Sequence, residues 1–212
     1  MAMRFLILLF IAGSVCAQTL DVQKALRDRY LDPVKRVFVT GDYERAANAA
    51  ATILSDGDAN PDYHRVLIQS LMLLGQKDPT LAAAKLAVAE HPADLHLLML
   101  RYDALVHFGE RGQLEAALRA LNDAARQKPP KERTTLDLVA LGRAALVVGA
   151  DPQKVIEQYF NPAKKKDPKA VEPWLALADL AMEKGDHQRA ARELQTGLKE
   201  AGEHPDLRHG LA

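Results

Sequence analysis

The sequence predicts an all-α fold, a right-handed α-solenoid built from stacked helix–turn–helix units. Gly41 and Gly75 each lie between two apolar, alanine-rich stretches and are 34 residues apart, and Asp151 and Gly185 are separated by the same 34 residues. An internal period of this length is typical of supersecondary units that stack, since no single unit can bury its apolar face alone. Few aromatic side chains and many Ala, Lys, Arg, Glu and Asp residues also favour helices.

Counting outward from the glycines divides the chain into five units and part of a sixth. When the turn glycine is set as residue 15 of a unit, the units span 27–60, 61–94, 98–131, 137–170 and 171–204, with a partial sixth at 205–212. Residue 15 is then Gly41, Gly75, Gly112, Asp151 and Gly185. Glycine suits a turn that needs a positive φ, whereas Asp151 and Pro152 favour a turn followed by a new helix.

Apolar stretches before and after each turn predict the two helices of a hairpin. In unit one, Pro33 indicates that the first helix begins there, and residues 20–31 are expected to form a separate lead-in helix. Five residues after the turn the side chains are mostly small, which predicts a close crossing of the two helices. Those residues are Ala46, Thr80, Ala117, Ile156 and Ala190. In units two to five, Pro or Gly is expected to end the second helix. The residues concerned are Pro92, Pro129, Pro168 and Gly202.

Residues 1–17 are predicted to be a secretory signal, which leaves 18–212 as the solenoid. A single positive charge at Arg4 precedes the unbroken apolar run 5–12, and small residues follow it, with cleavage expected after Ala17. The run is shorter than the ~20 residues that a membrane-spanning helix needs. An uncleaved anchor and lipidation of Cys16 remain as alternatives. Cleavage would leave no cysteine, so packing alone would hold an exported, periplasmic or cell-surface chain.

The pattern resembles the tetratricopeptide repeat, whose first helix carries Trp, Leu-Gly and Tyr and whose second carries Ala, Phe and Pro. The last full unit reads Trp174-Leu175-Ala176-Leu177-Ala178, then Gly185-Asp186, then Ala190 and Leu194. The fourth unit supplies Phe160, Ala163 and Pro168, and the third supplies Phe108, Leu121, Ala124 and Pro129. The resemblance covers about 27–212 and implies a non-catalytic solenoid that binds other proteins.

In this family the first helices line a concave groove, and partner peptides contact the second, fifth, ninth and twelfth residues of a unit. The resemblance therefore implies a partner groove in this chain. Its residues would be Arg65, Gln69, Met99, Tyr102, Val106, Leu138, Leu141 and Asp179. Apolar residues in units three and four suit hydrophobic anchors on a partner helix or extended peptide. Alternatively, Leu138 and Leu141 simply pack against neighbouring helices.

A second candidate surface is a basic rim, located where the second helix of one unit connects to the first helix of the next. It comprises Lys128, Lys131, Lys164, Lys165 and Lys166. Such a rim would dock an acidic partner or anionic lipid. The alternative is that these lysines only keep the turns soluble and complement helix C-termini. The formal net charge of zero argues against a general affinity for nucleic acid or anionic membranes.

Nothing in the sequence indicates catalysis, a metal or a cofactor. There is no Gly-x-Ser-x-Gly elbow and no glycine-rich phosphate loop ahead of a Lys-Ser or Lys-Thr pair. His91 and His96 are five residues apart, as are His204 and His209, whereas ligation from one helix needs a separation of four. Each pair also straddles a proline turn, so these histidines are expected to be exposed turn residues.

The sequence thus favours a non-catalytic protein–protein interaction scaffold of the bacterial cell envelope, with a partner peptide or helix in the groove. The partner would be another protein, with no nucleic acid and with membrane contact only through an uncleaved signal. One alternative is the N-terminal arm of a larger exported enzyme, such as a metallopeptidase, with its catalytic domain beyond Ala212. Another is a structural spacer without a partner.

Overall fold

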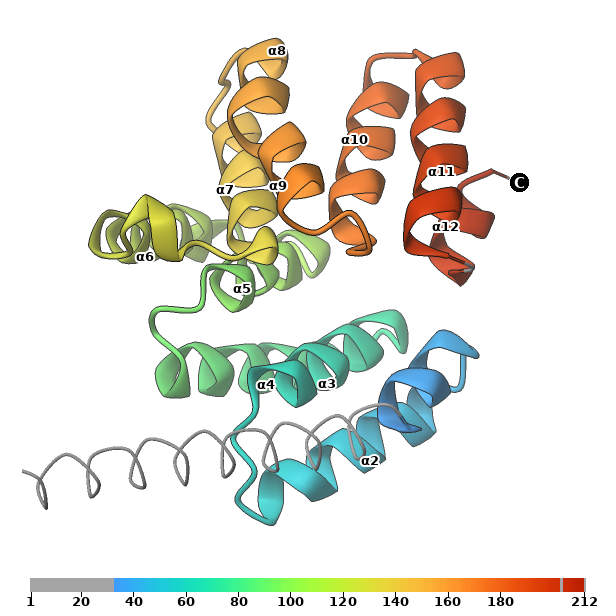
Figure 1. Cartoon of the computed structure of the whole chain (residues 1–212). Helices are drawn as coiled ribbons and strands as arrows, with labels where there is room; N and C mark the ends of the chain where they lie inside the picture. The colour runs from blue at the N-terminus through green and yellow to red at the C-terminus, as the bar shows by residue number, and fades with distance from the viewer. Residues whose placement is uncertain (1–32, 203, 212) are drawn as a thin grey trace, which may run out of the picture.

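The computed structural model describes residues 33–202 and 204–211, and every regular element within them is a helix (Figure 1). The helices follow one another as antiparallel hairpins, and each hairpin packs on the next. The predicted all-α solenoid of stacked helical hairpins is therefore confirmed. The predicted signal at 1–17 and the lead-in helix at 20–31 lie outside the described residues.

Five hairpins make up the described part. Residues 33–39 are helical and pair with α2 (Tyr43–Ser55). The second and third hairpins are α3 (Pro61–Leu73) with α4 (Lys77–Glu90), and α5 (Leu95–His107) with α6 (Leu114–Gln127). In the fourth, α7 (Thr135–Val147) pairs with a helix made of α8 (Pro152–Val155), η3 (Ile156–Phe160) and α9 (Asn161–Lys166). The fifth is α10 (Glu172–Glu183) with α11 (His187–Ala201), on which α12 (Pro205–His209) packs.

The turn glycines correct the predicted register of units three and four. Gly109 and Gly149 have φ values of 73° and 84°, so they are the equivalents of Gly41, Gly75 and Gly185. Gly112 does not make the turn, because it lies within the short 3-10 helix η1 (Arg111–Gln113). Unit three therefore starts at 95 and follows unit two directly, and unit four starts at 135. Extra residues fall in the turn of the third hairpin, at η1, and again after α6, around η2 (Pro130–Glu132).

Helix starts are fixed by local hydrogen bonds. The side chains of Asp42, Asp94 and Asp186 each accept a bond from a backbone N–H in the first turn of the following helix. At α7, Thr134 and Asp137 form a capping box in which each side chain accepts from the other's backbone N–H. These caps satisfy amide groups that a helix leaves unpaired at its start.

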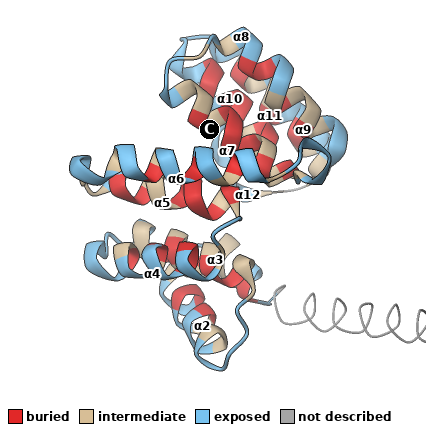
Figure 2. Cartoon of the chain, turned by 90° about the vertical axis from the view of Figure 1, so that its left-hand side faces the viewer, coloured by how far each residue is buried: buried red, intermediate tan, exposed pale blue. Residues whose placement is uncertain are grey.

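The core runs between hairpins as a series of apolar layers, which Figure 2 shows as buried stripes facing neighbouring helices. Phe160 is fully buried and lies against Gly142 of α7, where no larger residue would fit. The π-helical turn η3 ends at Phe160, two residues before Pro162, which cannot donate a backbone hydrogen bond. At the far end, Trp174 and the fully buried Leu207 of α12 share one cluster.

The helices of the first three hairpins run roughly from left to right in Figure 1, whereas those of the last two stand nearly upright. The first helices α3, α5, α7 and α10 pack in succession along the stack. Among the described helices, none combines the length and apolar character needed to cross a bilayer.

Candidate functional site

The first helices of four hairpins enclose a cleft of about 620 Å³. It receives side chains from α3, α5, α7 and α10, together with one from η3. The lining residues are Met72, Met99, Tyr102, Asp103, Val106, His107, Arg143, Leu146, Val147, Phe160, Ala176, Asp179, Leu180 and Glu183. Because these residues come from consecutive first helices, the cleft is the inner groove of the solenoid.

A partly buried ion pair links two of those helices within the groove. The guanidinium of Arg143 on α7 donates to both carboxylate oxygens of Asp103 on α5, over 2.8 and 2.9 Å. Burial raises the pKa of Asp103 above its ordinary value, while the charge and hydrogen bonds of Arg143 act in the opposite direction. The bidentate geometry fixes both side chains, so this part of the groove is pre-organised.

Two further carboxylates make the groove acidic. Asp179 and Glu183 lie one turn apart on α10, and no ion pair to either is found among the described residues. Burial raises the pKa of Asp179, Glu183 raises it further, and Arg143 lowers it. Three carboxylates thus face one guanidinium, which leaves an excess of negative charge that a cation could neutralise.

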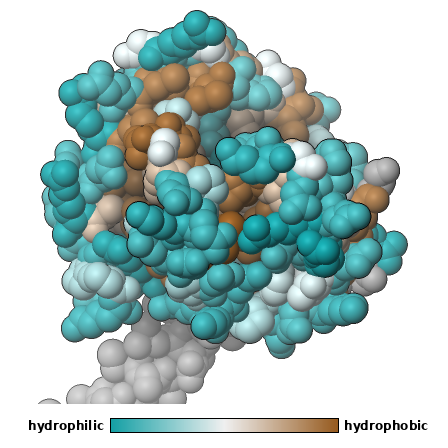
Figure 3. Space-filling view, turned by 90° about the horizontal axis from the view of Figure 1, so that it is seen from above, coloured by the Kyte–Doolittle hydropathy of each residue, from teal (hydrophilic) through white to brown (hydrophobic). Residues whose placement is uncertain are grey.

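Apolar side chains lie beside these charged groups. Val106 and Val147 are 51% and 44% exposed, large fractions for hydrophobic residues on an inner face. Met72 and Leu146 are partly buried beside them. Figure 3 shows exposed hydrophobic surface lying between hydrophilic margins on one face of the molecule. The groove therefore offers both hydrophobic contact and negative charge.

The sequence-derived groove residues fall into two groups. Met99, Tyr102, Val106 and Asp179 line the cleft. The other four do not, and they are Arg65, Gln69, Leu138 and Leu141. The guanidinium of Arg65 is paired with the carboxylates of Asp62 and Asp94, so it serves the contact between α3 and α5.

The placement of Leu138 and Leu141 is a correction to the sequence analysis. Leu141 is only 9% exposed and belongs to the central core, and Leu138 packs against the cluster that contains Phe160. Counting unit four from 135 puts Arg143 and Leu146 at the groove positions instead. Asp103 and Arg143 were missed because they become the ninth residues of their units only when Gly109 and Gly149 mark the turns.

Two lysines of the basic rim form ion pairs within the chain. The ammonium of Lys128 lies 2.6 Å from a carboxylate oxygen of Asp137. Lys164 pairs with Glu193 over 3.0 Å, and its ammonium lies 4.5 Å from the centre of the Trp174 ring. The remaining members of the rim, Lys131, Lys165 and Lys166, are exposed.

Three histidines are more buried than the sequence predicts. His64 is only 1% exposed, and ring nitrogens of His91 and His96 are buried without a hydrogen-bond partner. Burial lowers the pKa of His96 to about 4, with Arg65 and Arg143 lowering it and Asp94 and Asp62 raising it. The expectation that His91 and His96 are simple exposed turn residues is therefore wrong. His91 instead lies close to His64 and Glu90, which come from opposite helices of one hairpin.

No protein-family model matches the sequence, and no curated protein matches it. Among solved structures, the chain is similar to a thermophilic tetratricopeptide-repeat (TPR) protein of Thermus thermophilus. The sequence identity is 24%, the TM-score is 0.61, and the match covers 86% of this chain and 95% of that one. It is also similar to PilF of Pseudomonas aeruginosa, with 17% identity, a TM-score of 0.48 and coverage of 87% and 80%. The first likeness confirms a tetratricopeptide-type fold and, at this identity, establishes the fold alone.

Proposed function

We propose that this chain is a non-catalytic scaffold of the bacterial cell envelope that binds a segment of a partner protein in its inner groove. The observation that carries the proposal is the cleft formed by four consecutive first helices, which combines apolar side chains with an excess of carboxylates. A concave surface built on rigid helices is suited to an amphipathic helix or an extended peptide.

The charges of the groove favour a partner segment with a basic side chain between hydrophobic anchors. A Lys or Arg entering the groove would meet Asp179 and Glu183, and Arg143 is already held by Asp103. Hydrophobic anchors on either side would cover Val106 and Val147. Charge-assisted hydrogen bonds are stronger than neutral ones, and a bound segment would shield them from water.

The residue types of the groove suit binding, because apolar side chains and carboxylates lie together in it. The envelope location rests on the basic, apolar and small-residue series within 1–17. A reporter enzyme that is active only after export, fused behind residues 1–20, tests the location. Activity in cells supports export, and its absence contradicts it.

Selection from a random peptide display library tests the groove even though its partner is unidentified. The wild-type chain is compared with Asp179→Lys/Glu183→Lys, which reverses the charge of two groove residues. Glu115→Lys/Asp123→Lys is the matched control, because both residues are exposed on α6 outside the cleft. We expect the wild type and the control to enrich Lys or Arg flanked by apolar residues, and the groove variant to lose this preference. The same enrichment for all three proteins would contradict the proposal.

A further inference from the structure

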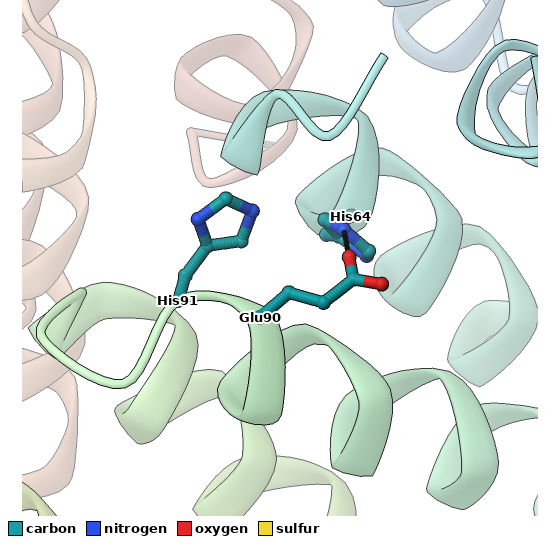
Figure 4. A group of neighbouring side chains, drawn as sticks. All are labelled: His64, Glu90 and His91. Atoms are coloured by element: carbon teal, nitrogen blue, oxygen red, sulfur yellow. Dashed lines mark hydrogen bonds and ion pairs between the residues drawn. The ribbon is translucent and has the colours of Figure 1, made fainter. Parts of the chain in front are cut away.

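Three potential metal ligands meet at one end of the second hairpin. His64 lies in the second turn of α3, Glu90 is the last residue of α4, and His91 is the C-cap of that helix. One ligand atom from each residue lies within 4.8 Å of the other two. Figure 4 shows the imidazole of His64 facing the carboxylate of Glu90, with the ring of His91 beside them.

The fold, rather than a sequence motif, brings these side chains together. The hairpin turns at Gly75, so the end of α4 returns to the start of α3 at the opposite end. His64 and Glu90 are 26 residues apart in sequence, yet Nε2 of His64 lies 2.8 Å from a carboxylate oxygen of Glu90. The ring centroids of His64 and His91 are 5.3 Å apart, in an edge-to-face arrangement.

The cluster leaves buried polar atoms that lack a protein partner. Nδ1 of His64 and Nε2 of His91 are both buried and accept or donate no hydrogen bond among the described residues. Leaving a buried polar atom unpaired costs about 1–3 kcal/mol. A ligand bound to Nε2 of His91 would remove that cost at this atom.

The electrostatic surroundings suit a cation. The cluster lies at the C-terminus of α4, where the backbone carbonyls carry partial negative charge. Glu90 adds a carboxylate, and its side chain is 40% exposed, so an ion can enter from solvent. Arg65 follows His64 in sequence, but its guanidinium is paired with Asp62 and Asp94.

We propose that His64, Glu90 and His91 form a binding site for a divalent transition-metal ion, with Zn²⁺ as the preferred ion. Two imidazoles and one carboxylate are common zinc ligands, and a water completes the tetrahedron. Ligand atoms around Zn²⁺ stand about 3.3 Å apart, so the cluster must close by about 1.5 Å from its 4.8 Å spread. Glu90 and His91 supply that movement, since one is exposed and the other follows the helix end.

A bound ion would cross-link the open end of the hairpin. It would tie the start of α3 to the end of α4, opposite the turn at Gly75. Since an ion that binds only the folded chain stabilises it by mass action, Zn²⁺ is expected to raise the melting temperature. None of the three ligands lines the groove, so the site is independent of the proposed partner binding.

The test uses tag-free, chelator-treated protein and metal salts alone. Isothermal titration calorimetry measures Zn²⁺ affinity and stoichiometry, and Co²⁺ titration provides a visible absorption band that reports tetrahedral coordination. The variants are His91→Ala and Glu90→Gln, which change surface-accessible members of the cluster, and His64→Ala is added if it keeps the wild-type circular dichroism. His187→Ala is the matched control, because this histidine is exposed on α11 away from the cluster.

We expect one Zn²⁺ per chain, a higher melting temperature with the ion, and a tetrahedral Co²⁺ spectrum. His91→Ala and Glu90→Gln should each weaken Zn²⁺ binding by at least about tenfold, and the control should bind as the wild type does. Binding that is undetectable in the wild type at millimolar Zn²⁺ would overturn the proposal. So would equal affinities in the wild type and His91→Ala, or loss of binding in the control.

Discussion

Gly142→Ala tests how closely α7 and η3 pack in the fourth hairpin. A Cβ at this position would lie 2.4 Å from Cε1 and 3.0 Å from Cδ1 and Cζ of Phe160. Ordinary carbon contacts are about 3.5–4.0 Å, so the ring must move by roughly 1 Å. Phe160 is completely buried and is held by core side chains of α7 and α10. Overpacking of this kind costs about 1–3 kcal/mol, and a rigid ring calls for the upper end of that range.

The helix itself partly offsets the clash. Alanine is favoured over glycine inside a helix by about 1 kcal/mol, so the expected net loss for Gly142→Ala is about 2 kcal/mol. Urea unfolding followed by circular dichroism measures it. The same substitution in a Phe160→Leu background is the control, and there it should cost clearly less, because the ring edge is gone. A gain of about 1 kcal/mol from Gly142→Ala would mean that the two helices do not approach as described.

Three further predictions concern the turns, the last hairpin and pH. Gly109→Ala should destabilise the fold by about 1 kcal/mol because φ is 73°, whereas Gly112→Ala in η1 should be nearly neutral in the same urea assay. Trp174→Ala should cost about 3–5 kcal/mol, since the ring is 6% exposed and its Nε1 donates to a backbone carbonyl; a loss below about 1 kcal/mol would contradict its burial. Because burial lowers the pKa of His96 from 6.5 to about 4, the unfolded chain takes up the proton first, and stability falls as the pH drops through that window. When the pH is lowered from neutral to 5, the free energy of unfolding of the wild type should fall by about 2 kcal/mol more than that of His96→Gln. Equal decreases in the two proteins, measured by denaturant titration, would contradict the lowered pKa of His96.

The hairpin repeat could be predicted from the sequence because its signals are local. The signals are turn glycines, alanines at helix crossings and prolines after second helices. Each can be recognised within a short stretch of sequence, and together they identified five hairpins. The register of units three and four depended on choosing between Gly109 and Gly112 and on the length of the segment 129–134. The conformation of the backbone, rather than residue type, decides between two nearby glycines.

The register error explains which of the predicted groove residues line the cleft. In unit three the shift is three residues, which turns a helix by about 300° and so leaves Met99, Tyr102 and Val106 near the same face. In unit four the shift is two residues, or about 200°, which moves Leu138 and Leu141 to the opposite, core-facing side. The different rotations in the two units therefore account for the different outcomes.

The histidine cluster could not be found by inspecting spacings along one helix. His64 is separated from Glu90 by 26 residues, and only the return of α4 along α3 brings them within 2.8 Å. A sequence search for two histidines one turn apart excludes such an arrangement. Pairing the early residues of a first helix with the late residues of the second would have revealed it.

Site-specific photocrosslinking tests the central claim, that the inner groove is the surface that partners touch. A photoreactive amino acid is introduced at Val106, in the groove and 51% exposed, or at Leu86, on the second helix α4 and 54% exposed. The two positions are matched in exposure and apolar character and differ in the face that they occupy. In cells that express the chain, we expect a discrete crosslinked product from position 106 and none from position 86. Products from position 86 alone, or the same products from both positions, would contradict groove binding.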